Sequence, residues 1–362
     1  MRHVLSAAIA VTFSLGVAHA QAPQGYPADY GKIVDAAKKE GKVVIYSTTD
    51  SVAAGPLIKD FEALYPGIKV EYSDLNSTEL YNRFIAEAAA NSGTGDLIWS
   101  SAMDLQVKLV ADGHALAYAS PEIKALPKWA VWKEAAYGTT YEPIAFVYNK
   151  RLVPAEDVPK SHGDLLKLLN AKIDVYKGKI TAYDPERSGV GYLFCTEDIK
   201  NFPQAWDLFK AFGKAQAKLY TSAGAMMERV TSGEHLIAYG IFGSYALGRS
   251  KKDPNLGIVL PKDYTMVTSR VAFISKQAKN PNAAKVFLDY ILSKRGQEII
   301  ANKADLYSLR SDVEGEATLK GVTAQIGDKA RPVPIDQSLL ENLDQAKRLA
   351  FLSKWQAAKK GQ

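Results

Sequence analysis

The sequence predicts an α/β protein of two lobes, each built around a doubly wound sheet. In the first third of the chain, short apolar runs of strand type alternate with amphipathic helical segments, which is the signature of such sheets. The 362 residues exceed what a single hydrophobic core usually holds, so two lobes are expected. Residues 141–148 and 267–274 are two further extended segments, each long enough to cross from one lobe to the other.

Turn and cap residues mark the borders of the first strand–helix units. Gly41 and the pair Pro66-Gly67 stop helices, and Asn76 with Glu79 three residues later starts one. The strands are continuous apolar runs, as expected where both faces of a sheet are buried. In order, the predicted elements are a helix at 30–39, a strand at 42–46, a helix around 57–65, a strand at 68–72, a helix from Asn76, a strand at 96–99 and a helix at 103–111.

In the remainder of the chain, strands and helices also alternate, but less regularly. Residues 312–332 are polar and weakly patterned, whereas the last ~25 residues have the periodicity of an amphipathic helix that packs on a lobe. The predicted elements here are strands at 179–183, 235–239 and 258–260, a glycine-punctuated turn at 240–243, and helices after Ser188, around 208–212 and from Asn280-Pro281.

The N-terminal segment predicts export. Arg2 precedes an apolar run from Val4 to Val17, and Ala18-His19-Ala20 has the small-x-small form of a signal-peptide cleavage site. The run is too short for a membrane helix, and no later run approaches the ~20 residues that one needs. We therefore expect cleavage after Ala20 and a soluble, monomeric protein in the periplasm.

Composition and charge exclude several classes of function. The net charge of +6 comes from scattered lysines and arginines, not from the concentrated basic stripe of a nucleic-acid-binding protein. Cys195, the single cysteine, is expected to be a small buried residue and cannot form an internal disulfide. The histidines are too widely spaced for a zinc site, so we predict no metal and no cofactor. Neither GxSxG nor GxxxxGKS occurs, and we do not expect an enzyme.

Hydroxyl side chains follow two of the predicted strands where each meets its helix. Ser47, Thr48 and Thr49 follow the first strand, and Ser100 and Ser101 end the third. Doubly wound sheets bind ligands at this edge, in the crevice beyond the carboxyl ends of their strands. The alternative for each hydroxyl is a helix N-cap that makes no ligand contact.

A second group of candidates indicates a negatively charged ligand. Arg187, Ser188 and Gly189 lie at a strand-to-helix junction, where free N–H groups and the helix dipole favour an anion. Arg187 can pair with a carboxylate or phosphate, or alternatively form a surface ion pair. The remaining candidates are Tyr239, Tyr245 and Tyr264, as aromatic walls or hydroxyl groups, and Arg270 in the return crossing, as a ligand contact or an inter-lobe salt bridge.

Seven segments spread over the mature chain carry a family resemblance: VVIYSTTD, YPGIKVEY, GTGDLIWSSAMD, YEPIAFVYNK, YDPERSGVGY, SGEHLIAYG and KNPNAAKVFLDYILSKRGQEII. Together they resemble the extracellular solute-binding proteins of ABC importers, in the class that includes ferric-iron binders. The resemblance implies a type II-like periplasmic-binding-protein fold whose two lobes, joined by hinge strands, close on a ligand. Residues 21–141 and 268–362 would then form lobe one and 142–267 lobe two, with the C-terminal helix on either lobe.

The resemblance also implies a function, with one departure. Such proteins deliver a captured ligand to an ABC permease in the inner membrane. The ferric branch is known for two adjacent tyrosines in the second lobe, whereas the corresponding stretch here runs from Tyr239 to Tyr245 without a Tyr-Tyr pair. We therefore predict a small organic anion, either a carboxylate, a phosphonate or a phosphate ester. A ferric-iron-binding protein of the same fold and a free periplasmic sensor subunit are the alternatives.

Overall fold

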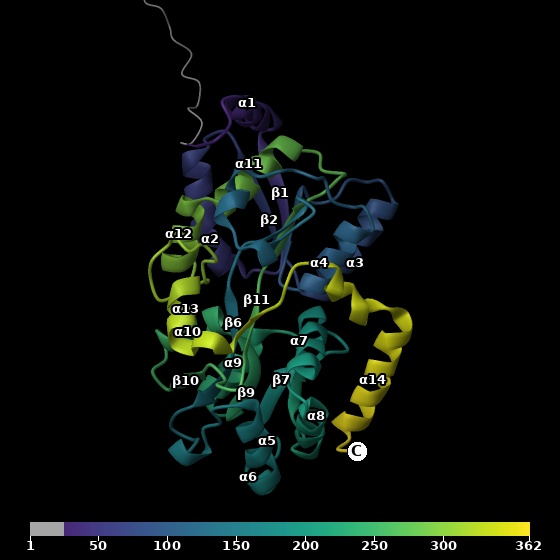
Figure 1. The fold of residues 1–362 in the computed structure, drawn as a ribbon, viewed down its shortest axis with the longest axis vertical. Helices are drawn as coiled ribbons and strands as arrows, with labels where there is room; N and C mark the ends of the chain where they lie inside the picture. Colours follow the sequence, from purple (N-terminus) through teal and green to yellow (C-terminus); the bar gives the residue numbers. More distant parts are fainter. Residues whose placement is uncertain (1–24) are drawn as a thin grey trace, which may run out of the picture.

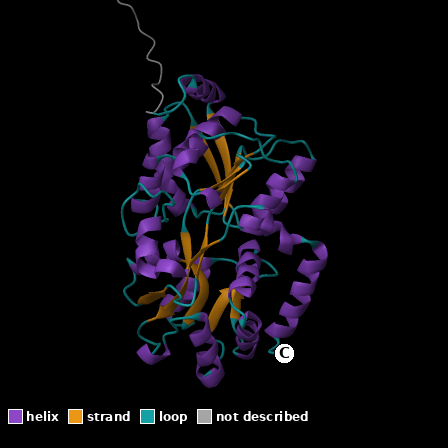
Figure 2. Ribbon diagram, viewed as in Figure 1, coloured by secondary structure: helices purple, strands orange, loops and turns teal. Residues whose placement is uncertain are grey.

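The computed structural model describes residues 25–362, so the predicted signal peptide lies outside the described residues. The chain forms two lobes stacked along the long axis of the molecule, each with a twisted sheet flanked by helices (Figure 1, Figure 2). Segments far apart in the sequence share the upper lobe, where α1 (Tyr30–Glu40) packs beside α11 (Pro281–Leu292). This is the two-lobed α/β fold that the sequence predicts.

The sheet of lobe one has the strand order β2-β1-β3-β12-β5-β4. β1 pairs in parallel with β2 and β3, whereas β12 runs antiparallel to β3 because the chain enters it from the other lobe. The strands are β1 (Lys42–Ser47), β2 (Lys69–Asp74), β3 (Leu97–Ser100), β4 (Val131–Trp132), β5 (Ala136–Gly138) and β12 (Val271–Ile274). The other helices of this part are α2 (Ser51–Leu64), α3 (Ser77–Ala89), α4 (Met103–Ala111), α12 (Lys294–Asn302) and α13 (Leu319–Ile326).

The sheet of lobe two has the order β13-β11-β6-β9-β7-β8, and β10 also pairs with β6. Its strands are β6 (Glu142–Asn149), β7 (Ile180–Tyr183), β8 (Lys218–Tyr220), β9 (Ile237–Phe242), β10 (Leu256–Val259), β11 (Thr265–Thr268) and β13 (Ala330–Pro332). The helices are α5 (His162–Ala171), α6 (Ile173–Tyr176), α7 (Gly189–Asn201), α8 (Ala205–Lys214), α9 (Ala223–Ser232), α10 (Gly243–Ser250) and α14 (Gln345–Lys359).

Two crossing segments lie side by side between the lobes. The first leads from β5 into β6, and the second joins β11 to β12 through Ser269 and Arg270. Arg270 accepts a hydrogen bond on its carbonyl from the Thr139 N–H at 2.9 Å, and its own N–H donates to Thr140 Oγ1 at 2.9 Å. Arg270 is therefore fixed at the point where the lobes meet.

Local signals placed most helix borders correctly. Gly41 ends α1 with a left-handed φ of 76°, and Asn76 Oδ1 caps α3 by accepting from the Glu79 N–H at 2.9 Å. Two predictions were wrong in detail. The predicted turn at 240–243 is instead the end of β9 and the start of α10, with Gly240 at φ +74° inside the strand. The C-terminal helix is divided at Asp344 into the 3-10 segment η5 (Gln337–Leu343) and α14. The weakly patterned residues 312–332, for which no element was predicted, contain α13 and β13.

The C-terminal segment contacts both lobes, whereas the predicted division assigned residues 268–362 to lobe one and left the C-terminal helix on either lobe. β13 pairs in parallel with β11 of the second sheet, η5 packs on α4 of lobe one, and α14 packs on α8 of lobe two (Figure 1). The aromatic rings of Phe351 and Trp355 lie against Trp206 and Phe209, with centroids 5.5 and 5.6 Å apart. This aromatic packing, which local periodicity does not reveal, attaches the tail to lobe two.

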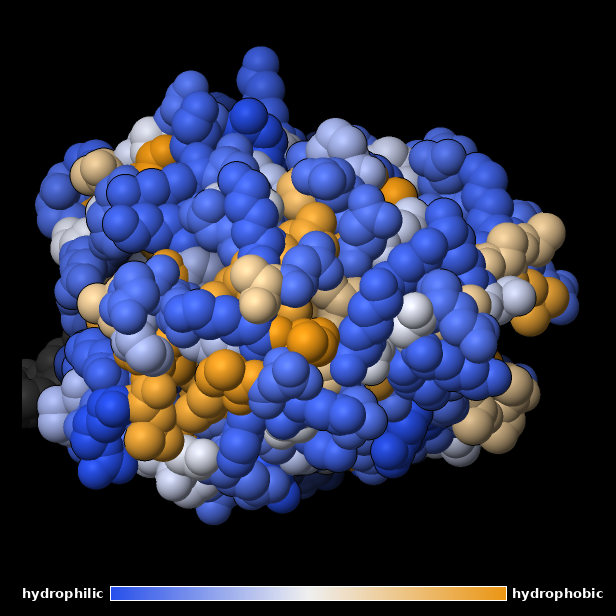
Figure 3. Space-filling model, turned by 90° about the horizontal axis from the view of Figure 1, so that it is seen from below, coloured by the Kyte–Doolittle hydropathy of each residue, from blue (hydrophilic) through white to orange (hydrophobic). Residues whose placement is uncertain are grey.

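Burial of apolar side chains accounts for the stability of both lobes. One cluster covers one face of the first sheet, and a second extends from its other face through lobe two; Cys195 is buried in the second cluster, as expected. Seen from the end that carries α5 and α6, the surface is mainly hydrophilic with smaller hydrophobic areas (Figure 3). None of the helices between residues 25 and 362 is long and apolar enough to span a bilayer.

A buried carboxyl lies where α4 meets the elements of lobe two. Asp104 is 3% exposed in the first turn of α4, and its Oδ1 accepts from the Leu105 N–H at 2.9 Å. Burial raises the pKa of Asp104 from 3.8 to about 7; Arg348 on α14 lowers it and Glu197 on α7 raises it. Because the folded state binds this proton more tightly than the unfolded state, Asp104 reduces stability as the pH rises from about 4 to about 7.

We expect Asp104→Asn to flatten this part of the pH dependence. The variant should gain up to about 4 kcal/mol over the wild type near pH 8 and little near pH 4, because an amide carries no charge to desolvate. Thermal unfolding across this pH range measures the effect. Asp112→Asn, at the exposed end of the same helix, is the control and should keep the wild-type slope. Equal slopes for all three proteins would contradict the assignment.

Candidate ligand-binding cleft

A cavity of about 240 Å³ lies between the lobes, where the carboxyl ends of strands from both sheets face one another. On the side of lobe one it begins beyond β1, β2 and β3, and on the side of lobe two beyond β7, β8 and β9. This is the position at which doubly wound sheets bind ligands. The lining residues are Thr48, Asp50, Asp74, Leu75, Asn76, Ser77, Glu79, Ser101, Tyr183, Ser188, Val190, Thr221, Ser222, Ala223, Gly224, Phe242, Tyr245 and Arg270.

Three helices begin at the wall of this cavity. α3, α7 and α9 start in lining residues, so their positive dipole ends face the enclosed space. In α7, Ser188 Oγ accepts from the Gly191 N–H at 3.2 Å, and in α9, Ser222 Oγ accepts from the Ala225 N–H at 3.4 Å. Since each cap satisfies one N–H of the first turn, the remaining first-turn N–H groups are available to a ligand.

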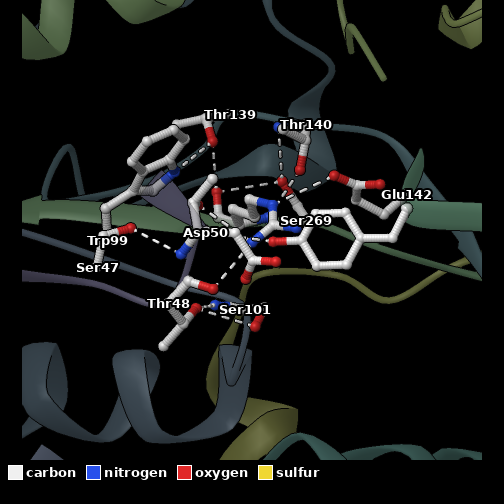
Figure 4. A network of polar contacts seen from close by, with 12 residues as sticks. Ser47, Thr48, Asp50, Trp99, Ser101, Thr139, Thr140, Glu142 and Ser269 are labelled. Carbon is white, nitrogen blue, oxygen red and sulfur yellow. Dashed lines mark hydrogen bonds and ion pairs between the residues drawn. The ribbon is translucent and has the colours of Figure 1, made fainter. Parts of the chain in front are cut away.

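Arg270 lines the cavity and belongs to a buried polar network. Figure 4 shows this network and labels its members Thr48, Thr140 and Glu142. Arg270 Nε donates to Glu142 Oε1 at 3.3 Å, and both side chains are at most 1% exposed. Its Nη1 donates to Thr49 Oγ1 at 3.1 Å and to the Thr48 carbonyl at 3.4 Å. Buried charges are tolerated only when they are paired and hydrogen-bonded in this way. Nη2 of Arg270 has no hydrogen-bond partner among the described residues.

Aromatic side chains cover the guanidinium from the side of lobe two. The Arg270 guanidinium carbon lies 5.0 Å from the ring centre of Tyr245 and 5.4 Å from that of Phe242. These cation–π contacts keep the charge of Arg270 close to the cavity. Burial raises the pKa of Tyr245 to about 12, even though Arg270 acts in the opposite direction, so its hydroxyl is neutral at physiological pH.

The predicted hydroxyl residues lie at this edge in two layers. Thr48 and Ser101 line the cavity, with their hydroxyl oxygens 3.0 Å apart. Ser47, Thr49 and Ser100 lie beneath them and are almost fully buried. Ser47 Oγ accepts from the Thr49 N–H and Ser100 Oγ from the Ala102 N–H, so these two hydroxyls support the loops rather than face the ligand space.

The lobes touch one another around the cavity. The Asp50 N–H donates to the Tyr245 hydroxyl at 3.1 Å, and Thr78 Oγ1 donates to the Arg187 carbonyl at 3.1 Å. Gly189 approaches lobe one so closely that a Cβ atom at this position would lie 2.8 Å from Leu105 Cδ1 and 3.2 Å from Ser77 Oγ. The lobes are therefore in contact beside the cavity, which remains open to solvent where Asp50, Asn76 and Glu79 are exposed.

Three of the predicted site residues lie elsewhere. The Arg187 side chain is exposed and does not line the cavity, because only its carbonyl faces lobe one. Tyr239 and Tyr264 are buried inside lobe two, where both hydroxyls donate to the Asp198 carboxylate at 2.6 Å. The prediction that these three side chains line the cleft was therefore wrong. The two tyrosines are inside lobe two because buried Asp198 needs hydrogen-bond donors, and Arg187 points to solvent.

Sequence reasoning missed several lining residues. Asp74 ends β2 and Asn76 follows it, and neither carries a motif that distinguishes it from a helix cap or a strand residue. The same is true of Glu142, which begins β6 and does not line the cavity but pairs with Arg270 behind it. Residues 221–224 follow β8, a three-residue strand too short to recognise. The sequence nevertheless indicates a helix start there, because Ser222 precedes a helical pattern just as Ser188 does.

Comparisons with known proteins agree with this architecture. Residues 56–324 match the family described as bacterial extracellular solute-binding protein. The chain belongs to this family. It is similar to the substrate-binding protein of an ABC transporter from Agrobacterium tumefaciens, with 38% identity and a TM-score of 0.84 over 88% of this chain and 94% of that chain. This solute-binding protein is accordingly a periplasmic substrate-binding component of an ABC transporter, a class that works with a membrane permease.

More distant structures share the fold. The periplasmic binding protein AfuA from Actinobacillus pleuropneumoniae is 24% identical, with a TM-score of 0.73 over 88% of this chain and 99% of that chain. A ferric binding protein from Campylobacter jejuni is 21% identical, with a TM-score of 0.70 over 87% and 99%. Within the described residues of the solute-binding protein, no three His, Cys, Asp or Glu side chains are grouped so as to hold a metal ion.

The close approach at Gly189 predicts how closure can be blocked. Gly189→Val should hold the lobes apart, because its Cβ alone would lie 2.8 Å from Leu105 Cδ1 and the two methyl groups need further space. We expect a larger radius of gyration in small-angle X-ray scattering and a ligand affinity reduced about tenfold. Gly163→Val is the control, since a Cβ there has only Ser161 Oγ nearby, at 3.8 Å. Wild-type dimensions and affinity in Gly189→Val would contradict this account.

Proposed function

We propose that this solute-binding protein captures a small organic anion in the inter-lobe cavity and delivers it to an ABC permease. One observation carries the proposal: the first turns of α3, α7 and α9 converge on a cavity whose only Arg or Lys lining residue in the described chain is Arg270. Helix N-termini and a guanidinium are the groups that recognise carboxylates and phosphates. The volume of about 240 Å³ suits a ligand smaller than a typical drug molecule.

The energetic requirement is modest. Micromolar affinity corresponds to about 8 kcal/mol, and hydrogen bonds to a charged group contribute roughly 1.5–3 kcal/mol each. A few N–H groups of α7 and α9, with the free Nη2 of Arg270, are sufficient in number. Tyr183, Phe242 and Tyr245 add apolar walls that exclude water from these contacts.

Closure couples binding to delivery. The ligand would contact lobe one and lobe two together only when they meet, so binding shifts the population toward the closed form. Direct inter-lobe contacts support this view, since Tyr245 and Arg187 of lobe two bond to Asp50 and Thr78 of lobe one. The permease then distinguishes the loaded, closed protein from the open one.

An organic anion accounts for the cavity better than ferric iron does. An iron site built from tyrosines needs both hydroxyls at one point. The Tyr239 hydroxyl donates to Asp198 inside lobe two, whereas Tyr245 lies at the cavity wall. Among the similar folds, AfuA is described with fructose-6-phosphate bound, so this architecture accommodates a phosphorylated organic anion.

The proposal predicts that the charge of Arg270 contributes to affinity. A double variant, Arg270→Gln with Glu142→Gln, removes both charges of the buried pair together and so leaves no uncompensated ion. We expect it to fold and to lose about 2 kcal/mol, or roughly thirtyfold, in anion affinity. Isothermal titration calorimetry with carboxylates, phosphonates and phosphate esters, guided by native mass spectrometry of the freshly purified protein, measures this.

The matched control is Arg187→Ala, which removes an exposed arginine near the cleft rim. Its affinity should stay within about twofold of the wild type, since exposed charges contribute little. A double variant that binds the anion as tightly as the wild type would refute the role of Arg270. Failure of the wild type to bind any anion of the panel would refute the proposed function itself.

A further inference from the structure

The two walls of the cavity differ in charge. Among the described residues that line it, lobe one supplies three carboxylates, Asp50, Asp74 and Glu79. The lining residues from lobe two include no Asp, Glu, Lys or Arg in the described chain, but they contain the starts of α7 and α9. One wall is thus negative and the other carries two positive helix ends. A ligand that spans the gap meets opposite electrostatic environments at its two ends.

Asp50 differs from Asp74 and Glu79 because its carboxylate makes no hydrogen bond that stabilises a helix start. It occupies the N-cap position of α2, where an aspartate normally accepts from the first helical turn, yet within the described chain its side chain makes no cap bond. Asp74 on the neighbouring strand takes that role instead, since its Oδ2 accepts from the Ser51 N–H at 2.8 Å. The Asp50 carboxylate lines the cavity and forgoes the stabilisation that the helix offers.

The surroundings of Asp50 leave its charge incompletely balanced. Arg270 is the cation that lowers the pKa of Asp50, but Arg270 already has a buried counterion in Glu142, at 3.3 Å. The Tyr245 hydroxyl accepts from the Asp50 N–H at 3.1 Å; it is neutral, and its hydrogen bond to the Asp50 side chain lowers the pKa of that carboxyl without supplying a charge. Burial raises the pKa of Asp50 and nearby Asp74 raises it further, whereas Arg270 lowers it. A positive group placed next to Asp50 would therefore relieve an existing electrostatic cost.

A ligand with negative charge alone fits this cavity poorly. The helix ends of lobe two attract it, but the three carboxylates of lobe one repel it, and only Arg270 among the lining residues opposes them. A ligand with a second, cationic end converts that repulsion into attraction. It also bonds to both lobes, which is what closure requires.

We propose that the ligand is a small zwitterion whose anionic group lies at the N-termini of α7 and α9 and whose ammonium group is bound by Asp50. This inference rests on the proposed function, because it takes an anion-binding cavity as given. It narrows the substrate class to compounds that carry an amino group a few bonds from a carboxylate, phosphonate or phosphate. Asp50 is then the residue that determines specificity for the amino group.

Matched ligands test the proposal in calorimetric titrations of the full-length mature protein. The pairs are 2-aminoethylphosphonate with ethylphosphonate, phosphoethanolamine with ethyl phosphate, and β-alanine with propionate. In every pair that binds, the amino compound should bind at least about tenfold more tightly, the effect of one charge-assisted hydrogen bond. Equal or tighter binding of the deaminated compound would overturn the proposal. If no compound of any pair binds while another anion of the wider panel does, the zwitterion proposal fails and the proposed function stands. If the wild type binds no anion of that panel either, both fail.

Two variants separate the effect of the Asp50 charge on ligand preference from the effect of removing any carboxylate. Asp50→Asn should reduce the preference for the amino compound to within about threefold while leaving the deaminated compound bound as tightly as before or more tightly. Asp174→Asn removes an exposed charge on α6 and should keep the wild-type ratio. A full preference in Asp50→Asn would overturn the assignment to Asp50. Equal affinities of the wild type for 2-hydroxyethylphosphonate and 2-aminoethylphosphonate would show that a neutral hydrogen-bond donor is sufficient. That result would overturn the proposal that Asp50 binds an ammonium group.

Discussion

The buried ion pair of Arg270 and Glu142 organises the region where the two lobes meet. Both side chains are almost completely removed from water, and a charge in that position is tolerated only with a partner and further hydrogen bonds. Thr48 and Thr49 supply those bonds from the loop after β1, and Thr140 holds the Arg270 backbone. The pair therefore joins the two crossing segments to the loop after β1, and the cavity lies beside Arg270.

The surroundings of this pair explain why the cavity lies between the lobes and not within one of them. Strands of both sheets end there, and the loops that leave them begin helices whose N-termini face the same space. Each lobe alone exposes half of these groups to water. Contact between Gly189 and lobe one brings the two halves together, so that groups of both lobes line one cavity and fewer water molecules screen the interactions between them.

Much of this architecture was predictable from local chemistry. Continuous apolar runs, glycine stops and side-chain caps placed β1, α3 and α11 close to their actual borders. The rule that ligands bind beyond strand ends identified Thr48 and Ser101. Local reasoning failed where a residue's role depends on a distant partner. Tyr239 and Tyr264 donate hydrogen bonds to Asp198, which lies 41 and 66 residues away along the chain. Their sequence context contains no trace of that carboxylate.

Local patterns in the chain were thus enough to predict the class of protein, the alternation of strands and helices, and the sheet edge at which the cavity lies, because period, turns and caps act over a few residues. They could not predict which side chains line the cavity together, because that depends on contacts between the lobes. The tertiary structure moved Arg187 to the surface, placed Arg270 in the interior and brought Asp50 opposite the starts of α7 and α9. Asp50 and the starts of these two helices come from segments more than a hundred residues apart, and only the packing of two lobes sets their distances.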